Sequence, residues 1–138
     1  MSSIKTLNKL IAIIGWGSLI WEPKSLNYNK SLGWINNGPL LPVEFARISN
    51  DNRLTLVITE SGTLVKTFYT LANINTTFED AIENLQIREG CNIKNIGYYR
   101  AETNEFHPED FLFKNEIKEW SIKTKIKNYA APQKPYNN

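Results

Sequence analysis

The feature that most restricts the fold of this chain is an unbroken apolar run near its start. Residues 10–16 read LIAIIGW and carry no charged side chain. A strand of this composition is typical of a sheet covered on both faces, since an exposed face would leave isoleucine and leucine in water. The run therefore predicts a fully buried strand.

A glycine-rich break ends this run. Gly15, Trp16, Gly17 and Ser18 interrupt the apolar residues before Leu19 resumes them. A glycine–X–glycine–serine turn after a buried strand exposes backbone N–H groups, which can bind an anion or a developing oxyanion. A bulge or a bend in a closed sheet uses the same residue types. From the loop alone, both interpretations stay open.

The middle of the chain alternates apolar and polar side chains with the period of β-strands. The alternating runs cover residues 43–49, 53–59 and 63–72, with short turns between them. This spacing predicts an antiparallel meander. A further strand is expected over 93–102, and a weaker alternation continues at 122–130.

One segment changes to the period of an α-helix. Four apolar side chains recur at i, i+3, i+4 and i+7: Phe78, Ala81, Ile82 and Leu85. Thr76 and Glu79 have the spacing of a capping box, and Gly90 stands where a glycine often ends a helix. These residues predict a helix that closes at Gly90. A shorter helix is expected around Ile117 and Trp120.

Size and charge exclude several classes. A chain of 138 residues predicts one domain, 1–138, with a flexible tail over about 131–138. Sixteen basic and fourteen acidic residues give a net charge of +2. Lysines gather toward the C-terminus, but Glu116 and Glu119 interrupt them, which is typical of a solvated face. Since no recognition motif accompanies them, we expect no nucleic-acid partner. An interaction module in this segment is the weaker alternative.

The sequence also favours a cytoplasmic location. The first apolar stretch is too short to cross a bilayer, and no signal-peptide cleavage pattern follows it. Cys91 is the only cysteine, so no internal disulfide can form and a reducing compartment is indicated. We therefore expect no membrane partner. Nothing in the sequence fixes the oligomeric state.

Metal and cofactor chemistry finds little support. His107 is the only histidine, so the chain lacks a zinc constellation and a Cys–His pair. We interpret His107 as a surface or turn residue and Cys91 as a small buried side chain. Gly15 and Gly17 form no dinucleotide fingerprint, because a third glycine is absent. The sequence predicts no metal and no cofactor.

Carboxylates are the remaining candidates for chemistry. Glu89 falls in the last turn of the predicted helix, where the helix dipole disfavours its charged form, and this suits a general base. The alternative is a solvent-exposed glutamate beside Arg88. Glu44, in an alternating strand, is a second candidate that faces either a cavity or solvent. Glu60 is interpreted as a turn residue.

The order of these elements resembles the γ-glutamylcyclotransferase-like superfamily. A strand ending in GWGSL is followed by β-runs, a helix closing in REG at residues 88–90, and a strand containing Gly97, Tyr98 and Tyr99. The resemblance covers residues 10–102. It implies an α+β fold in which a small, closed, mixed or antiparallel sheet, barrel-like in shape, is flanked by helices.

The resemblance also implies roles for individual residues. Glu89 matches the catalytic glutamate of the family, and Gly90 matches the glycine after it. The implied substrate-binding residues are Trp16, Gly17, Ser18, Leu19 and Gly90. Gly15 and Tyr98 are further candidates for substrate binding, and the alternative for Tyr98 is a tyrosine buried in a strand. Trp16 departs from the family pattern, which has a tyrosine at this position, and an indole can only donate a hydrogen bond.

The implied activity is a cofactor-independent cyclotransferase reaction on a γ-glutamyl amine or peptide, glutathione included. Glu89 accepts a proton from the α-ammonium, the freed amine attacks the γ-carbonyl, and 5-oxoproline and an amine are released. The loop at Gly17–Leu19 binds the α-carboxylate and the γ-carbonyl oxygen. The leaving group stays open, and γ-glutamyl-modified antibiotics or cross-linked amines are further possibilities. The alternative from another class is a non-catalytic protein that binds an amino-acid-like ligand.

Overall fold

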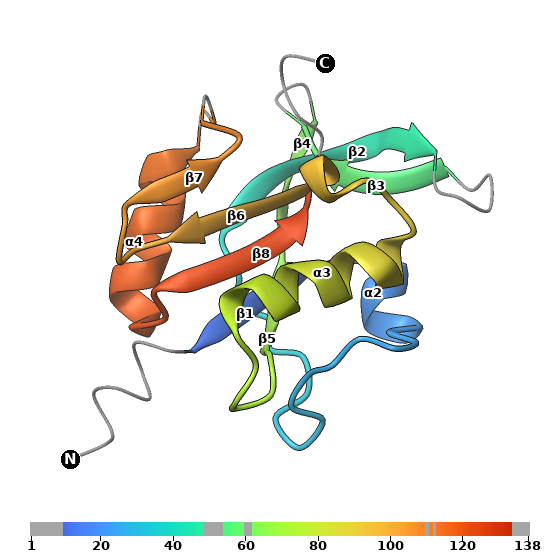
Figure 1. The fold of residues 1–138 in the computed structure, drawn as a ribbon. Coiled ribbons are helices and arrows are strands. Elements are labelled where there is room, and N and C mark those ends of the chain that lie inside the picture. Colours follow the sequence, from blue (N-terminus) through green and yellow to red (C-terminus); the bar gives the residue numbers. More distant parts are fainter. Residues whose placement is uncertain (1–9, 49–53, 60–61, 110, 112, 134–138) are drawn as a thin grey trace.

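The strands of the computed structural model form two sheets (Figure 1). The structure describes residues 10–48, 54–59, 62–109, 111 and 113–133. The larger sheet has the order β5-β1-β8-β6-β7 and consists of β1 (Ile11–Gly15), β5 (Phe68–Leu71), β6 (Ile96–Arg100), β7 (Glu105–His107) and β8 (Asn128–Pro132). Its β1 and β8 are parallel, and the other neighbours are antiparallel. Glu60 and the turn at 49–53 lie outside the described residues.

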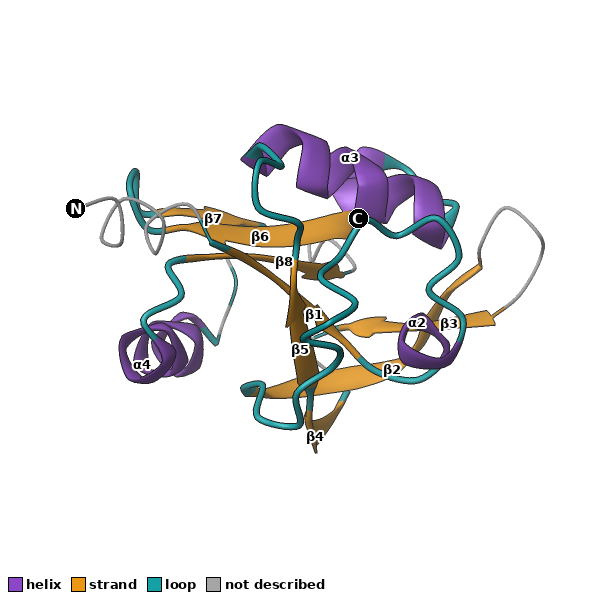
Figure 2. Cartoon of the chain, turned by 90° about the horizontal axis from the view of Figure 1, so that it is seen from below, coloured by secondary structure: helices purple, strands orange, loops and turns teal. Residues whose placement is uncertain are grey.

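The larger sheet is covered on both faces. Figure 2 shows α3 (Phe78–Glu89) on one side, and α4 (Lys114–Thr124) with the smaller sheet on the other. All residues of β1 are buried, and its side chains alternate between two cores. Ala12 and Ile14 pack between the sheets, whereas Ile13 packs in the core with Ile82 and Leu85 of α3. The predicted strand with two covered faces is confirmed.

The smaller sheet has the order β3-β2-β4, so the predicted meander is wrong although its strands are antiparallel. It consists of β2 (Leu40–Ile48), β3 (Leu54–Ile58) and β4 (Thr63–Lys66). After β3 the chain crosses β2 to its other edge. A Cβ on Gly62 would lie 2.5 Å from the backbone nitrogen of Val43. Glycine at position 62 therefore allows the crossing, and β4 pairs with β2 rather than with β3.

The expected barrel-like closure is also wrong, because the described strands form two separate sheets in an α+β architecture. The predicted strand over 63–72 breaks at Thr67, whose hydroxyl donates to the carbonyl oxygen of Pro39 at 2.7 Å. On the other side, β3 reaches β8 through the bridge between Ile58 and Gln133. Strands β1 and β6 already pair with the two edges of β8. Strand β3 therefore meets the chain only just beyond the C-terminal end of β8, at Gln133.

Helix α3 confirms the predicted periodicity. Ala81, Ile82 and Leu85 are buried, and Gly90 follows the helix in the left-handed conformation. The N-cap, however, is Thr77 rather than Thr76. The Thr77 hydroxyl accepts a hydrogen bond from the backbone N–H of Asp80 at 3.1 Å. The capping spacing of the sequence is thus shifted by one residue.

The C-terminal part differs from its predicted pattern. Ile117 and Trp120 are buried in α4, as expected. The weak alternation over 122–130 is not one strand, since α4 continues to Thr124 and β8 begins at Asn128. The expected tail over 131–138 also begins too early, because β8 includes buried residues up to Pro132 and Gln133 is buried. Residues 134–138 lie outside the described part.

We expect Thr77→Ala to lower the free energy of unfolding by about 1 kcal/mol, because the substitution removes the N-cap of α3. Thr76→Ala is the matched control and should change stability by less than about 0.5 kcal/mol. Urea unfolding followed by circular dichroism measures both values. Equal losses in the two variants would contradict the assignment of the cap to Thr77.

Candidate functional site

The glycine loop is a turn from strand to helix rather than a bend within a sheet. Strand β1 ends at Gly15, and the one-turn helix α2 (Ser18–Trp21) begins three residues later. Gly17 has φ 57° and ψ −133°, a conformation that favours glycine. Leu19 folds back over the end of β1, since a Cβ on Gly15 would lie 2.7 Å from its Cδ2.

The loop presents the start of a helical turn. The carbonyl oxygen of Gly17 accepts from the backbone N–H of Ile20 at 3.0 Å. The leading N–H groups of a helix have no acceptor within it, and in α2 these belong to Ser18 and Leu19. The Ser18 residue is exposed, whereas Leu19 is buried. The turn thus fixes the backbone N–H groups that were predicted from the sequence to bind an anion.

Glu89 is the last residue of α3 and is buried, not solvent-exposed. The Arg88 Nη1 lies 3.0 Å from Glu89 Oε2, and each side chain is only 4% exposed. Neighbouring residues of a helix do not normally face each other. Here the long arginine side chain reaches the carboxylate at the helix end. The guanidinium and the carboxylate thus pair in the protein interior, where an isolated charge is strongly disfavoured.

The same guanidinium contacts the glycine loop. Arg88 Nη2 donates to the carbonyl oxygen of Ser18 at 2.9 Å, and Nε donates to that of Glu22 at 2.8 Å. Both carbonyls belong to α2 or its C-cap. One side chain therefore joins the loop to Glu89, and the Ser18 oxygen and the Glu89 carboxylate are separated by a single guanidinium group.

The structure links two of the predicted site residues, Ser18 and Glu89, through Arg88. Gly17 precedes Ser18 as the N-cap of α2, and Gly90 follows Glu89 as the C-cap of α3. Trp16 is half-buried and packs against the core between the two sheets.

Tyr98 does not join this group. Its ring makes an edge contact with Phe78 at 5.3 Å between centroids and stacks on His107 at 5.5 Å. Phe78 opens α3 and Glu89 closes it, which places them about 16 Å apart along the helix axis. Tyr98 therefore lies near the start of α3 rather than beside Glu89, and its binding role stays a prediction.

The remaining candidates lie elsewhere. Glu44 is half-buried in β2, opposite Val57 of β3. Cys91 is half-buried and packs against the core beneath α3. His107 is in β7, not in a turn, and its Nε2 lies 3.0 Å from the carbonyl oxygen of Lys94.

Two polar residues of interest were not predicted. From the sequence, Arg88 was only the neighbour of an exposed glutamate. Its position in the REG motif was the signal that could have identified it. Gln133 is 1% exposed, and within the described residues its carboxamide has no hydrogen-bond partner. A Cβ on Gly97 would lie 1.9 Å from the Gln133 Oε1, so glycine at 97 makes room for the carboxamide. No sequence signal marked Gln133.

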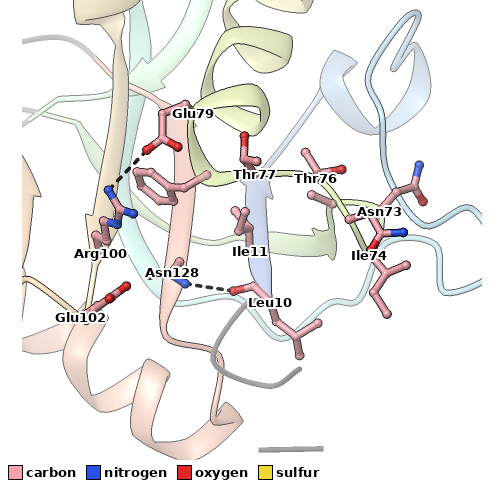
Figure 3. Close-up of a pocket in the computed structure, with 13 residues that line it drawn as sticks. Leu10, Ile11, Asn73, Ile74, Thr76, Thr77, Glu79, Arg100, Glu102 and Asn128 are labelled. Carbon is pink, nitrogen blue, oxygen red and sulfur yellow. Dashed lines mark hydrogen bonds and ion pairs between the residues drawn. The ribbon is translucent and has the colours of Figure 1, made fainter. Parts of the chain in front are cut away.

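A separate cavity of about 580 Å³ opens at the first turn of α3 (Figure 3). It lies beside the ion pair between Arg100 and Glu79, whose Nη1 and Oε2 atoms are 3.3 Å apart. Asn128 Nδ2 donates across it to the carbonyl oxygen of Leu10 at 3.4 Å. This cavity is at the opposite end of α3 from Glu89 and does not belong to the loop site.

The described residues contain neither a candidate metal cluster nor a candidate membrane-spanning helix. Among the residues that the structure describes, no group of three or more His, Cys, Asp or Glu side chains is arranged to hold a metal ion. In the same part of the chain, no helix is long and apolar enough to cross a membrane.

Comparison with known proteins returns no family model, no curated protein and no solved structure that matches this chain.

The phenols of β6 predict a loss of stability at alkaline pH. Burial raises the pKa of Tyr98, with a further rise from Glu105, and burial raises the pKa of Tyr99. The folded chain therefore holds these protons more tightly than the unfolded chain, where the pKa is about 10. The free energy of unfolding should fall as the pH rises above that value.

Urea unfolding at a series of alkaline pH values measures this effect. The double variant Tyr98→Phe/Tyr99→Phe lacks both phenols and should show a shallower decline of stability with pH. An unchanged slope in the double variant would show that other groups cause the decline.

Proposed function

We propose that this protein is a γ-glutamylcyclotransferase-like enzyme that converts a γ-glutamyl amine or peptide into 5-oxoproline and a free amine. The observation that supports the proposal is the Arg88 guanidinium, which contacts both the carbonyl oxygen of Ser18 and the carboxylate of Glu89. One side chain thus contacts both motifs of the resemblance, which are far apart in sequence. The proposal includes a γ-glutamylcyclotransferase-like fold and a cytoplasmic location.

Glu89 acts as the general base in this reaction. Its carboxylate accepts a proton from the α-ammonium of the substrate, and the resulting amine attacks the γ-carbonyl carbon. The tetrahedral intermediate carries its negative charge on the former carbonyl oxygen, and the N–H groups at the start of α2 stabilise it. Glu89 then returns the proton to the leaving nitrogen as the γ-amide bond breaks.

Positioning supplies much of the acceleration. The amine and the carbonyl belong to one substrate molecule, so ring closure is intramolecular and needs no second reactant. The protein has to hold the substrate in a bent conformation and to exchange one proton with it. A loop fixed by Arg88 and a carboxylate fixed by the same group suit this task.

A non-catalytic protein that binds an amino-acid-like ligand is the second candidate. Glu89 is buried and ion-paired with Arg88, as a purely structural carboxylate would be. Trp16 also replaces the tyrosine of the family pattern, so any contact of a tyrosine hydroxyl is lost. Release of 5-oxoproline separates the two functions.

We expect 5-oxoproline to be released from at least one member of a panel of γ-glutamyl amines and dipeptides that includes glutathione. Glu89→Gln should lower the rate about 100- to 10,000-fold, because the amide cannot accept the proton. Glu83→Gln is the matched control, since Glu83 is exposed on the same helix, and it should retain the wild-type rate.

Chromatography of the reaction mixture measures the product. Equal rates for wild type and Glu89→Gln on an active substrate would remove Glu89 from the mechanism. If neither protein releases 5-oxoproline while a ligand still binds, the non-catalytic function is supported instead.

A further inference from the structure

We propose that a lysine-lined groove beside α4 binds an acidic peptide segment that carries one apolar side chain. The groove has a volume of about 650 Å³ and lies between α4, the turn after β6 and the connection from α4 to β8. Helix α4 is on the opposite side of the larger sheet from α3 (Figure 2). The inference is therefore independent of the reaction proposed at Glu89. We call this hollow the basic groove, and its lining includes Tyr99, Ala101, Lys118, Ile122, Lys125 and Lys127.

The fold separates the lysines of this segment from its glutamates. Lys118 and Ile122 are four residues apart and share one face of α4, and Lys125 follows as the C-cap. Around the helix axis, Glu119 is turned by about 100° and Glu116 by about 160° from Lys118. Neither glutamate lines the groove. The acidic residues that interrupt the lysines in the sequence thus do not neutralise this surface.

The positive charges of the basic groove are not paired within the protein. In the part of the chain that the structure describes, no ion pair joins Lys118, Lys125 or Lys127 to a carboxylate. Lys118 is half-buried, with its Nζ 5.9 Å from the centre of the Phe106 ring, whereas Lys125 and Lys127 are exposed. A hollow lined by charges of one sign focuses the electric field and attracts ligands of opposite charge. Carboxylates are therefore the expected polar groups of the partner.

Hydrogen bonds fix the segment that carries two of these lysines. The Ser121 hydroxyl donates to the carbonyl oxygen of Ile126 at 2.5 Å. The carbonyl oxygen of Lys127 accepts from the backbone N–H of Ala101 at 3.0 Å. The connection is thus tied to α4 on one side and to the turn after β6 on the other. Because this backbone is fixed before binding, a partner has to order only side chains here.

The apolar part of the groove favours a peptide over a nucleic acid or a membrane. Ile122 is 77% exposed, so a partner that covers it removes apolar surface from water. Bases stack on accessible aromatic rings, whereas Tyr99, the aromatic residue of the lining, is only 8% exposed. A helix that lies on a membrane needs a broad apolar face, but Ile117 and Trp120 of α4 are buried in the core. One apolar side chain flanked by carboxylates matches this surface.

An NMR titration of the ¹⁵N-labelled protein with synthetic peptides tests the proposal. The acidic probe has one leucine between two runs of glutamates. One control peptide has glutamine in place of every glutamate, and the other has glycine in place of the leucine. We expect the acidic probe to shift resonances of the basic groove and to bind at least about tenfold more tightly than either control. Equal affinities, or shifts confined to other surfaces, would overturn the proposal.

Substitutions of exposed residues locate the contacts. Ile122→Ser should weaken binding of the acidic probe about tenfold, because it removes the apolar contact. Ile87→Ser is its matched control, since Ile87 is 62% exposed on α3, and it should keep the wild-type affinity. The double variant Lys125→Gln/Lys127→Gln should weaken binding about fivefold. Lys123→Gln removes an exposed charge of α4 outside the groove and should weaken it less than about twofold.

The other anionic partners are tested in the same way. A single-stranded oligothymidylate and vesicles of phosphatidylserine in phosphatidylcholine each carry negative charge without the peptide arrangement. Tighter binding of either one than of the acidic probe would overturn the assignment of a peptide. An equal loss of probe binding per charge in Lys123→Gln and in the double variant would also overturn it, since binding would then follow net charge. Urea unfolding reports whether each variant folds, and the peptide controls decide on the wild-type protein if one does not.

Discussion

The geometry around the glycine loop depends on one buried guanidinium. A buried charge has to be paired or hydrogen-bonded, and Arg88 meets this need with two main-chain carbonyls and one carboxylate. Those carbonyls belong to the first residue and to the C-cap of the one-turn helix α2, which is too short to be stable by itself. The conformation of a loop that follows β1 is thus fixed by a side chain from the last turn of α3.

The parts of the fold that local sequence determines were predictable, and the parts that depend on crossings were not. The unbroken apolar run predicted β1, and the i, i+3, i+4, i+7 spacing predicted α3, because each pattern reports which faces are covered. The pairing order depends on details that periodicity does not encode. The close approach at Gly62 sends β4 to the far edge of β2, and the hydrogen bond of Thr67 divides an apparently continuous strand.

The candidate site shows the same division. The loop and Glu89 were identified from a motif, whereas burial of Arg88 could not be predicted, because charged residues at a helix end are usually solvated. Tyr98 lies away from Glu89 for a geometric reason. Ile96 packs in the same core as Leu85, and Tyr98, two residues further along β6, contacts Phe78 at the start of α3. Strand β6 therefore carries the chain away from Glu89 at about 3.3 Å per residue.

The buried pair contributes to the structure through hydrogen bonds more than through its charges. Replacing a buried ion pair by well-packed apolar side chains is often neutral or stabilising, so the attraction between the charges alone gives little reason for a pair at this position. An apolar side chain, however, cannot donate to the carbonyl oxygens of Ser18 and Glu22, as Arg88 does. Glu89 then places a negative charge next to the guanidinium in the protein interior. The need to hold a one-turn helix against the end of α3 thus accounts for a buried arginine, and the buried arginine accounts for the carboxylate beside it.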